Sequence, residues 1–175
     1  KKRINSNLPA ILIFGEDFSK AENFWQRAIK RLKLPEEINS KERLLEMLNQ
    51  AGKKSKCRSL FIIDALNETN PVSFWQIHLK EIYEEIKRYP NIALVISIRS
   101  GFEDEILTKE LKEKFIQEKH IGFAFKEWEA VTKFFNAYSL PLPEVPLLTP
   151  EFQNPLFLLL LCKALKKKRN YFFFS

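Results

Sequence analysis

The sequence is poor in the residues from which metal centres and disulfide frameworks are built. Its 175 residues include two cysteines, Cys57 and Cys162, and two histidines, His78 and His120. These residues lie too far apart along the chain to form a metal-ligand cluster of recognisable spacing. The sequence therefore supports neither a zinc site nor a disulfide-stabilised fold.

Long apolar segments are also missing. The longest uninterrupted run, Leu156–Cys162, is far shorter than the roughly 20 residues that a membrane-spanning helix needs. No secretory signal peptide opens the chain. We therefore expect a soluble, cytoplasmic protein with no membrane partner, and we interpret the glycosylation triplet at residues 67–69 as a chance match.

The composition is that of a globular protein of about one domain, with 45% hydrophobic and 29% charged residues. The net charge is +7, but much of the excess lies in residues 1–3 and 166–169. Such charge runs are usually solvated. No stretch interleaves aromatic and basic residues as a platform for stacking bases requires, so the sequence does not support a nucleic-acid partner.

Three short apolar runs predict the strands of a sheet. They are Pro9–Phe14, Leu60–Ile63 and Ile92–Ile98. Polar residues do not alternate with apolar ones in these runs, which favours strands covered on both faces, as in a parallel α/β sheet.

Helical patterns separate and follow these strands. Ser19 and Glu22 form a capping box for a helix that ends before Pro35, and the apolar spacing predicts further helices. One begins at Asn39 or Ser40 and ends at Gly52. Another begins at Asn70 and Pro71 and is broken by Tyr89, Pro90 and Asn91, and a third covers most of Phe102–Glu118. The fold class is therefore α/β, with right-handed crossovers between the strands.

The C-terminal third changes composition. A short strand or extended connector at Lys119–Phe123 and a helix at Trp128–Tyr138 precede a proline-rich linker, so we expect two parts, residues 1–146 and 147–175. Asn154 is expected to cap a last helix that begins at Pro155. Residues 170–175 fit no amphipathic pattern, and we expect a truncated or frameshifted end there.

The stretch Leu60–Glu68 (LFIIDALNE) carries the chemistry on which the functional interpretation depends. Asp64 stands at the carboxyl end of a strand, where parallel sheets bind ligands, and such an aspartate is a natural partner of Mg²⁺ on nucleotide phosphates. Glu68 is placed to orient or activate water, and Arg99 ends the next strand in the same crevice. In the alternative, Asp64 opens an ordinary turn and Asn67 and Glu68 cap the following helix. The stretch alone leaves both interpretations open.

Four segments in this order resemble a known family: FIIDALNE, ALVISIRS, HIGFAFKEWEAVTKFF and PEFQNPLFLLLLCKAL. Together they look like a STAND-class P-loop NTPase. More narrowly, they are similar to the NACHT-like ATPase module of prokaryotic antiviral defence proteins of the Avs type, from about Pro9 to Leu165. The resemblance implies a three-layer α/β/α sheet, followed by the start of a helical subdomain. It also implies ATP and Mg²⁺ as cofactors, a sensed protein ligand and self-association of the intact protein.

The same resemblance implies roles for individual residues. FIIDALNE is the Walker B strand, in which Asp64 coordinates Mg²⁺ and Glu68 is the catalytic acidic residue that closes the pattern. Asn67 stands where a second aspartate is common. Arg99 matches the sensor 1 arginine that detects the γ-phosphate, and Pro155 matches a proline that packs near the adenine.

One motif of the family is missing from the chain. A P-loop needs GxxxxGK[ST], whose backbone amides, lysine and hydroxyl hold the phosphates. The nearest look-alike, at residues 52–55, has Met47 in place of the first glycine and Lys54 in place of the hydroxyl residue. We therefore expect an incomplete sheet from a fragment that lacks the first strand and the phosphate loop, inactive alone and prone to self-associate.

Two other functions remain open. A metal-dependent nuclease of the type that uses an ExK dyad has candidates at Glu85–Lys87 and Glu110–Lys112, although both lie in helical patterns and such a dyad normally lies on a strand. A non-catalytic interaction scaffold is favoured by the missing phosphate loop.

Overall fold

The computed structural model describes residues 8–19, 23–144 and 149–172 of the chain. The chain divides into two compact units, Lys1–Ile116 and Gln117–Ser175. The division therefore lies about thirty residues before the expected boundary at 146. The reason is that the helix before the proline-rich linker shares a hydrophobic core with the helix after it, so the linker is internal to the second unit.

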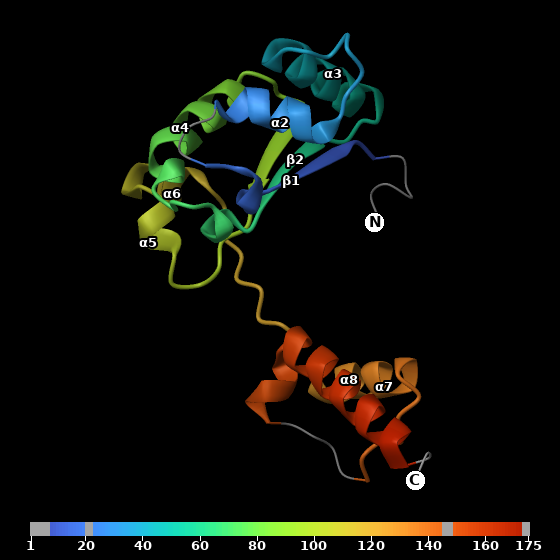
Figure 1. Cartoon of the computed structure of the whole chain (residues 1–175). Coiled ribbons are helices and arrows are strands. Elements are labelled where there is room, and N and C mark those ends of the chain that lie inside the picture. Colours follow the sequence, from blue (N-terminus) through green and yellow to red (C-terminus); the bar gives the residue numbers. More distant parts are fainter. Residues whose placement is uncertain (1–7, 20–22, 145–148, 173–175) are drawn as a thin grey trace. The chain divides into compact units, whose positions relative to one another are not determined.

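The first unit is built on a three-stranded parallel sheet (Figure 1). Strand β2 (Ser59–Asp64) lies in the centre, between β1 (Ala10–Phe14) and β3 (Ile92–Ile96). The register pairs Phe14 with Asp64 and Ile63 with Ile96, so all three strands end at the same edge. This confirms the α/β class and the strand positions to within one or two residues.

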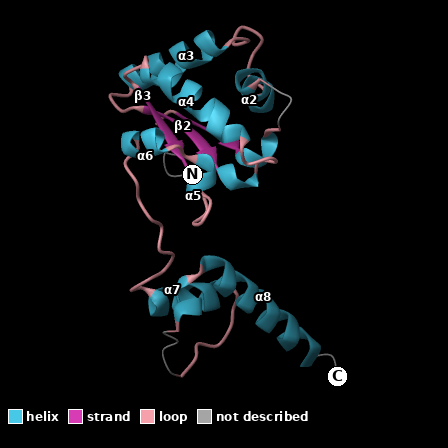
Figure 2. Ribbon diagram, turned by 90° about the vertical axis from the view of Figure 1, so that its left-hand side faces the viewer, coloured by secondary structure: helices cyan, strands magenta, loops and turns pink. Residues whose placement is uncertain are grey.

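Helices follow each strand of the first unit along the chain. Figure 2 shows them in cyan beside the magenta strands. Between β1 and β2 lie α2 (Phe24–Leu32) and α3 (Lys41–Lys54), and α4 (Phe74–Lys87) connects β2 to β3. Two short helices, α5 (Glu103–Ile106) and α6 (Lys109–Lys114), follow β3. Thr108 separates them, because its hydroxyl caps α6 by accepting a hydrogen bond from the Leu111 amide at 3.3 Å. One helix was expected over this region.

Helix α2 begins later than predicted. Asn23 is its cap, since the amides of Trp25 and Gln26 donate to Asn23 Oδ1 at 3.0 and 3.3 Å. The capping box predicted at Ser19 is therefore wrong: Ser19 instead forms an isolated bridge with Asn70, and its partner Glu22 lies outside the described residues.

The ends of α3 and the start of α4 also differ in part from expectation. Ser40 caps α3 as predicted, accepting a hydrogen bond from the Arg43 amide at 3.3 Å. Gly52, however, lies inside α3 and does not end it. A Cβ on Gly52 would lie 2.3 Å from the carbonyl oxygen of Asn91, so glycine is required by the close approach of the helix to the residue before β3. Helix α4 begins at Phe74, after a turn that includes Pro71.

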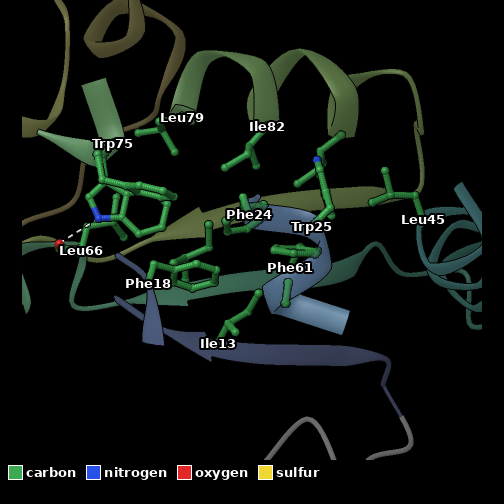
Figure 3. Packing of buried hydrophobic residues seen from close by; sticks show 14 of the residues in the cluster. Ile13, Phe18, Phe24, Trp25, Leu45, Phe61, Leu66, Trp75, Leu79 and Ile82 are labelled. Atoms are coloured by element: carbon green, nitrogen blue, oxygen red, sulfur yellow. Dashed lines mark hydrogen bonds between the residues drawn. The ribbon is translucent and has the colours of Figure 1, made fainter. Parts of the chain in front are cut away.

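The core of the first unit lies on one face of the sheet (Figure 3). Phe61 and Ile63 of β2 are fully buried there, against aromatic side chains of α2 and α4. Trp25 and Phe61 meet edge to face, with ring centroids 5.5 Å apart. Helices α5 and α6 join the same core through Ile106 and Leu111.

The opposite face of the sheet is not covered by a helical layer in the described part of the unit. Leu12, Phe14 and Val95 are exposed by 47%, 41% and 40%. The register places them on one face together with Leu60 and Ile62, because successive side chains of a strand point to opposite faces. The expected three-layer arrangement is thus two layers here, and the expectation that β2 is buried on both faces is wrong.

The second unit consists of α7 (Glu127–Ala137), a 3₁₀ turn η3 (Pro150–Gln153) and α8 (Pro155–Phe172). No strand forms at residues 119–123. Asn154 caps α8 as predicted, since the amides of Leu156 and Phe157 donate to Asn154 Oδ1 at 2.9 and 3.3 Å. Among the helices of the described residues, none is both long and apolar enough to span a membrane.

Candidate functional site

The carboxyl edge of the sheet gathers polar residues from neighbouring strand ends. Asp64 is the last residue of β2, and Ser97 and Arg99 follow β3. Because β2 and β3 are parallel and adjacent, these residues lie at one edge, as the sequence predicted for Asp64 and Arg99. Asp64 is half-buried, and Ser97 and Arg99 are exposed.

Ser97 connects the two strand ends through its side chain. Its hydroxyl donates to the carboxylate of Asp64 and accepts a hydrogen bond from the Ala65 amide at 2.7 Å. The backbone ladder continues past the strands, from the Ser97 amide to the Ile63 carbonyl at 3.1 Å and from the Leu66 amide to the Ser97 carbonyl at 3.0 Å. The loop that follows Asp64 is therefore fixed to the end of β3.

Asn67 makes a second connection between the same loops. The amide of Arg99 donates to Asn67 Oδ1 at 2.9 Å. Asn67 therefore orients the backbone of Arg99 and does not cap a helix. Helix α4 begins seven residues later, at Phe74, with no side-chain hydrogen bond from its cap residue. This excludes the alternative in which Asn67 and Glu68 cap the following helix.

The backbone from Ala65 to Glu68 follows an unusual path that buried partners stabilise. Ala65 has a left-handed conformation (φ 57°) and leads into a 3₁₀ turn, η2 (Leu66–Glu68). A Cβ on Gly15 would lie 2.2 Å from the Ala65 carbonyl oxygen, so only glycine permits this approach of the β1 end. Glu68, the predicted water-orienting residue, is exposed at the end of the turn.

Two buried side chains, those of Thr69 and Trp75, stabilise this turn through hydrogen bonds. Thr69 donates its hydroxyl hydrogen to the Gly15 carbonyl at 2.7 Å. Trp75 Nε1 donates to the Leu66 carbonyl at 2.9 Å, a bond drawn in Figure 3, and to Thr69 Oγ1 at 2.8 Å. Sequence patterns alone do not assign this role to Thr69 or Trp75. The signal available in the sequence was the tryptophan at the start of the helix that follows Glu68.

Asp17, a third acidic residue at the end of β1, has a structural role. It is buried and pairs with Arg31 of α2, and the Arg27 Nε donates to its backbone carbonyl at 2.9 Å. The hydrogen bond to Asp17 raises the pKa of Arg31. Because its charge is already compensated, Asp17 is not a candidate ligand.

Pro155 lies elsewhere in the chain. It is the first residue of α8, in the second unit, and its side chain lies beside Gly122. Its predicted role near an adenine therefore stays a prediction, whereas Asp64 and Arg99 belong to one sheet edge.

The carboxyl edge offers few ligands for a metal ion. Among the described residues, no three histidine, cysteine or acidic side chains form a group that could hold one. Asp64 alone at this edge still fits Mg²⁺, which is commonly held by one or two carboxylates together with water and phosphate oxygens. For phosphates the chain offers the exposed Arg99 but no GxxxxGK[ST] loop.

The two ExK candidates for a nuclease are both on helices. The carboxylate of Glu85 in α4 accepts hydrogen bonds from Trp25 Nε1 and Lys41 Nζ, and so connects α4 to α2 and α3. Glu110 in α6 pairs with Lys80 and Lys114. Neither dyad has the strand geometry that places carboxylate and amine on the same metal, and the structure therefore argues against this function.

Comparison of the chain with protein-family models, with curated proteins and with solved structures finds no match.

Proposed function

We propose that the carboxyl edge of the sheet is the acidic half of a nucleotide site, in an ATPase module of the STAND type with a NACHT-like arrangement that serves antiviral defence. The observation that carries the proposal is the pairing of Asp64 at the end of the central strand with Ser97, two residues before Arg99, at the end of its neighbour. An acidic residue and a basic residue at adjacent ends of parallel strands suit a Mg²⁺–nucleotide ligand.

Each residue has a distinct part in this proposal. Asp64 binds Mg²⁺ directly or through water, and Ser97 orients its carboxylate. Arg99, whose backbone Asn67 fixes, contacts the terminal phosphate. Glu68, exposed at the end of η2, orients the attacking water. The nucleotide supplies the phosphoanhydride bond that is hydrolysed, and Mg²⁺ neutralises charge that develops on its phosphates.

The missing phosphate loop limits what these residues can do. No GxxxxGK[ST] occurs in these 175 residues, so the backbone amides, lysine and hydroxyl that would bind the phosphates are not supplied by them. We therefore expect weak binding of Mg²⁺-ATP and no detectable hydrolysis by this chain. Robust ATP turnover that Glu68→Gln abolishes would contradict this expectation.

A paramagnetic titration tests the acidic half of the site. Mn²⁺ replaces Mg²⁺, and ATP with Mn²⁺ is added to the ¹⁵N-labelled chain while amide signals are followed by NMR. We expect selective broadening of the amides of Asp64–Glu68 and Ser97–Arg99. Asp64→Asn should abolish this broadening, because an amide is a poor ligand for a hard cation.

The matched control is Asp104→Asn, which makes the same chemical change at an exposed aspartate of α5 that pairs with Lys112. It should leave the broadening intact. Uniform broadening over the surface, or an equal response in both variants, would overturn the proposal.

A non-catalytic scaffold is the second candidate, and a specific observation favours it. Asp64 and Asn67 both make hydrogen bonds within the chain that stabilise the strand-end loops, so their presence is explained without a ligand. Under this alternative, calorimetry with Mg²⁺-ATP detects no heat of binding while far-UV circular dichroism shows the fold intact.

A further inference from the structure

A cluster of cations lies at the amino ends of the strands of the same sheet, opposite the carboxyl edge. We name it the basic edge and define it by six residues of two loops and of the ends of α3 and α4 that precede them: Lys53, Lys54, Lys56, Arg58, Lys87 and Arg88. All six side chains are exposed. The loops lead into β2 and β3, and so lie at the amino ends of adjacent parallel strands.

Direct contacts hold the two loops together. The Ser59 amide donates to the Asn91 carbonyl at 2.8 Å. The amide and the side chain of Asn91 donate to Asn49 Oδ1 at 3.2 and 3.0 Å. Gly52 approaches Asn91 so closely that a Cβ would not fit. The cations of both loops therefore belong to one rigid surface, although thirty residues separate them along the chain.

Three of the six cations, the lysines at the end of α3 and in the loop after it, have no carboxylate partner in the described part of the chain. Residues 47–63 and 86–98 contain no aspartate or glutamate. Elsewhere in the first unit cations do pair with acids, as in Lys41 with Glu85 and Lys114 with Glu84. Within the described residues, Lys53, Lys54 and Lys56 form no ion pair. Exposed cations of one sign repel each other, so these three neighbouring lysines indicate a partner of opposite charge.

Helix dipoles explain only part of the cluster. Lys53, Lys54 and Lys87 lie in the last turns of α3 and α4, where the partial negative charge of the helix end favours cations. Lys56 and Arg58 lie beyond α3, in the loop before β2, where this effect has fallen off. The dipoles of α3 and α4 therefore do not account for all six cations of the basic edge.

We propose that the basic edge binds the phosphate backbone of a nucleic acid, without reading its sequence. Regularly spaced phosphates match a surface on which several lysines from two loops are fixed together. A lipid surface favours large apolar side chains beside the cations. In residues 50–59 and 86–91 no large apolar side chain is exposed, which favours the nucleic acid. The basic edge is separate from the carboxyl edge, so this binding does not depend on the nucleotide site.

Fluorescence anisotropy with a labelled 20-base-pair DNA duplex, and in a parallel arm an RNA duplex, tests the proposal over a range of salt concentrations. The variant Lys53→Gln/Lys54→Gln/Lys56→Gln removes three charges from exposed positions. At about 100 mM salt it should weaken binding roughly tenfold or more, and it should reduce the slope of log K against log salt by about 2 to 3, since each phosphate contact contributes about 0.9. Lys87→Gln/Arg88→Gln, from the other loop, should act in the same direction.

The matched control is Lys109→Gln/Lys126→Gln/Lys163→Gln, which changes the net charge equally at exposed lysines outside the basic edge. It should alter affinity less than threefold. Equal losses in both triple variants, no binding of either duplex by the unaltered chain, or binding of phosphatidylserine vesicles in preference to both duplexes would each overturn the proposal.

Discussion

Ser97 donates its hydroxyl hydrogen to the carboxylate of Asp64, so a side chain of the β3 end fixes the orientation of the acid at the β2 end. The same oxygen accepts the Ala65 amide at 2.7 Å. Ser97→Ala removes both bonds and should lower the free energy of unfolding by about 1 kcal/mol. Hydrogen exchange of the Ala65 amide should become faster than in the unaltered chain. The control is Ser100→Ala, three residues further on, which should leave both quantities unchanged.

Glu85 should be important for stability and not for metal-dependent cleavage. Its side chain is 12% exposed and accepts hydrogen bonds from Trp25 and Lys41. Glu85→Ala leaves the indole N–H without its acceptor and should cost about 2 kcal/mol in urea unfolding. Glu85→Gln should cost less, because an amide oxygen can still accept. Glu81→Ala, at an exposed position of the same helix, should change stability by less than about 0.5 kcal/mol. Plasmid cleavage with Mg²⁺ that Glu85→Gln abolishes would contradict this role.

The contact between α4 and α6 should weaken in acid. The hydrogen bond to Lys114 lowers the pKa of Glu84, and bonds to Lys80 and Lys114 lower the pKa of Glu110. Because the pKa of each glutamate is lowered in the folded state, its ion pairs contribute fully to stability above the ordinary glutamate pKa. This contribution is lost as the pH falls below about 4.5. The difference in unfolding free energy between the unaltered chain and Lys114→Gln should therefore be constant from pH 6 to 8 and shrink between pH 4.5 and 3. A difference that grows in acid would contradict the assignment.

Gly15 should tolerate no side chain. A Cβ there would lie 2.2 Å from the Ala65 carbonyl oxygen and 2.9 Å from the Ala65 carbonyl carbon, both backbone atoms that cannot move aside easily. Gly15→Ala should cost about 3 kcal/mol in thermal or urea unfolding. Gly101→Ala is the comparison, because Gly101 has a positive φ of 98° but no atom near its Cβ position. It should cost about 1 kcal/mol, through backbone conformation alone. Equal costs at the two sites would show that the end of β1 and the turn at Ala65–Glu68 can separate without penalty.

Labelling of Cys162 should report on the second unit alone. The side chain is buried in the core of α7 and α8, and burial raises the pKa of its thiol, so it should react slowly with a disulfide reagent. Val131→Ala, in the same core, should speed its labelling about tenfold or more. Leu79→Ala, in the core of the first unit, should not. A common effect of both variants would mean that the two units open together.

The sequence predicts the strands of this fold well because each strand is an apolar run with clear limits. Gly15 ends the first and Asp64 the second, and the structure places the strands within one or two residues of those limits. Helix starts were harder to predict where several residues could act as caps. Ser19 and Asn23 are both good capping residues, but in the structure Asn23 accepts the first amides of the helix and Ser19 forms a bridge with Asn70.

Burial of the two sheet faces could not be predicted from apolar runs alone. Phe61 and Ile62 are both large and apolar, yet one is fully buried against helices and the other is only half-buried. Which helices form a layer depends on contacts between distant segments. The sequence predicts that Asp64 and Arg99 lie at adjacent strand ends, and the structure confirms this placement. The hydrogen bonds that position them come from Ser97 and Asn67, whose roles depend on how adjacent strand ends meet.

The uncovered face of the sheet has a consequence for Asp64. Side chains alternate along a strand, so Asp64 points to the same side as Leu60 and Ile62, with Phe14 beside it in the next strand. In water the attraction between a carboxylate and a cation is weak, and it strengthens several-fold as the dielectric constant of the surroundings falls. Any protein layer that covers this face excludes water from the side of Asp64. In the proposed Mg²⁺ site, the affinity of Asp64 for the ion would therefore depend on what packs against Leu12, Ile62 and Val95 as well as on the other ligands of the ion.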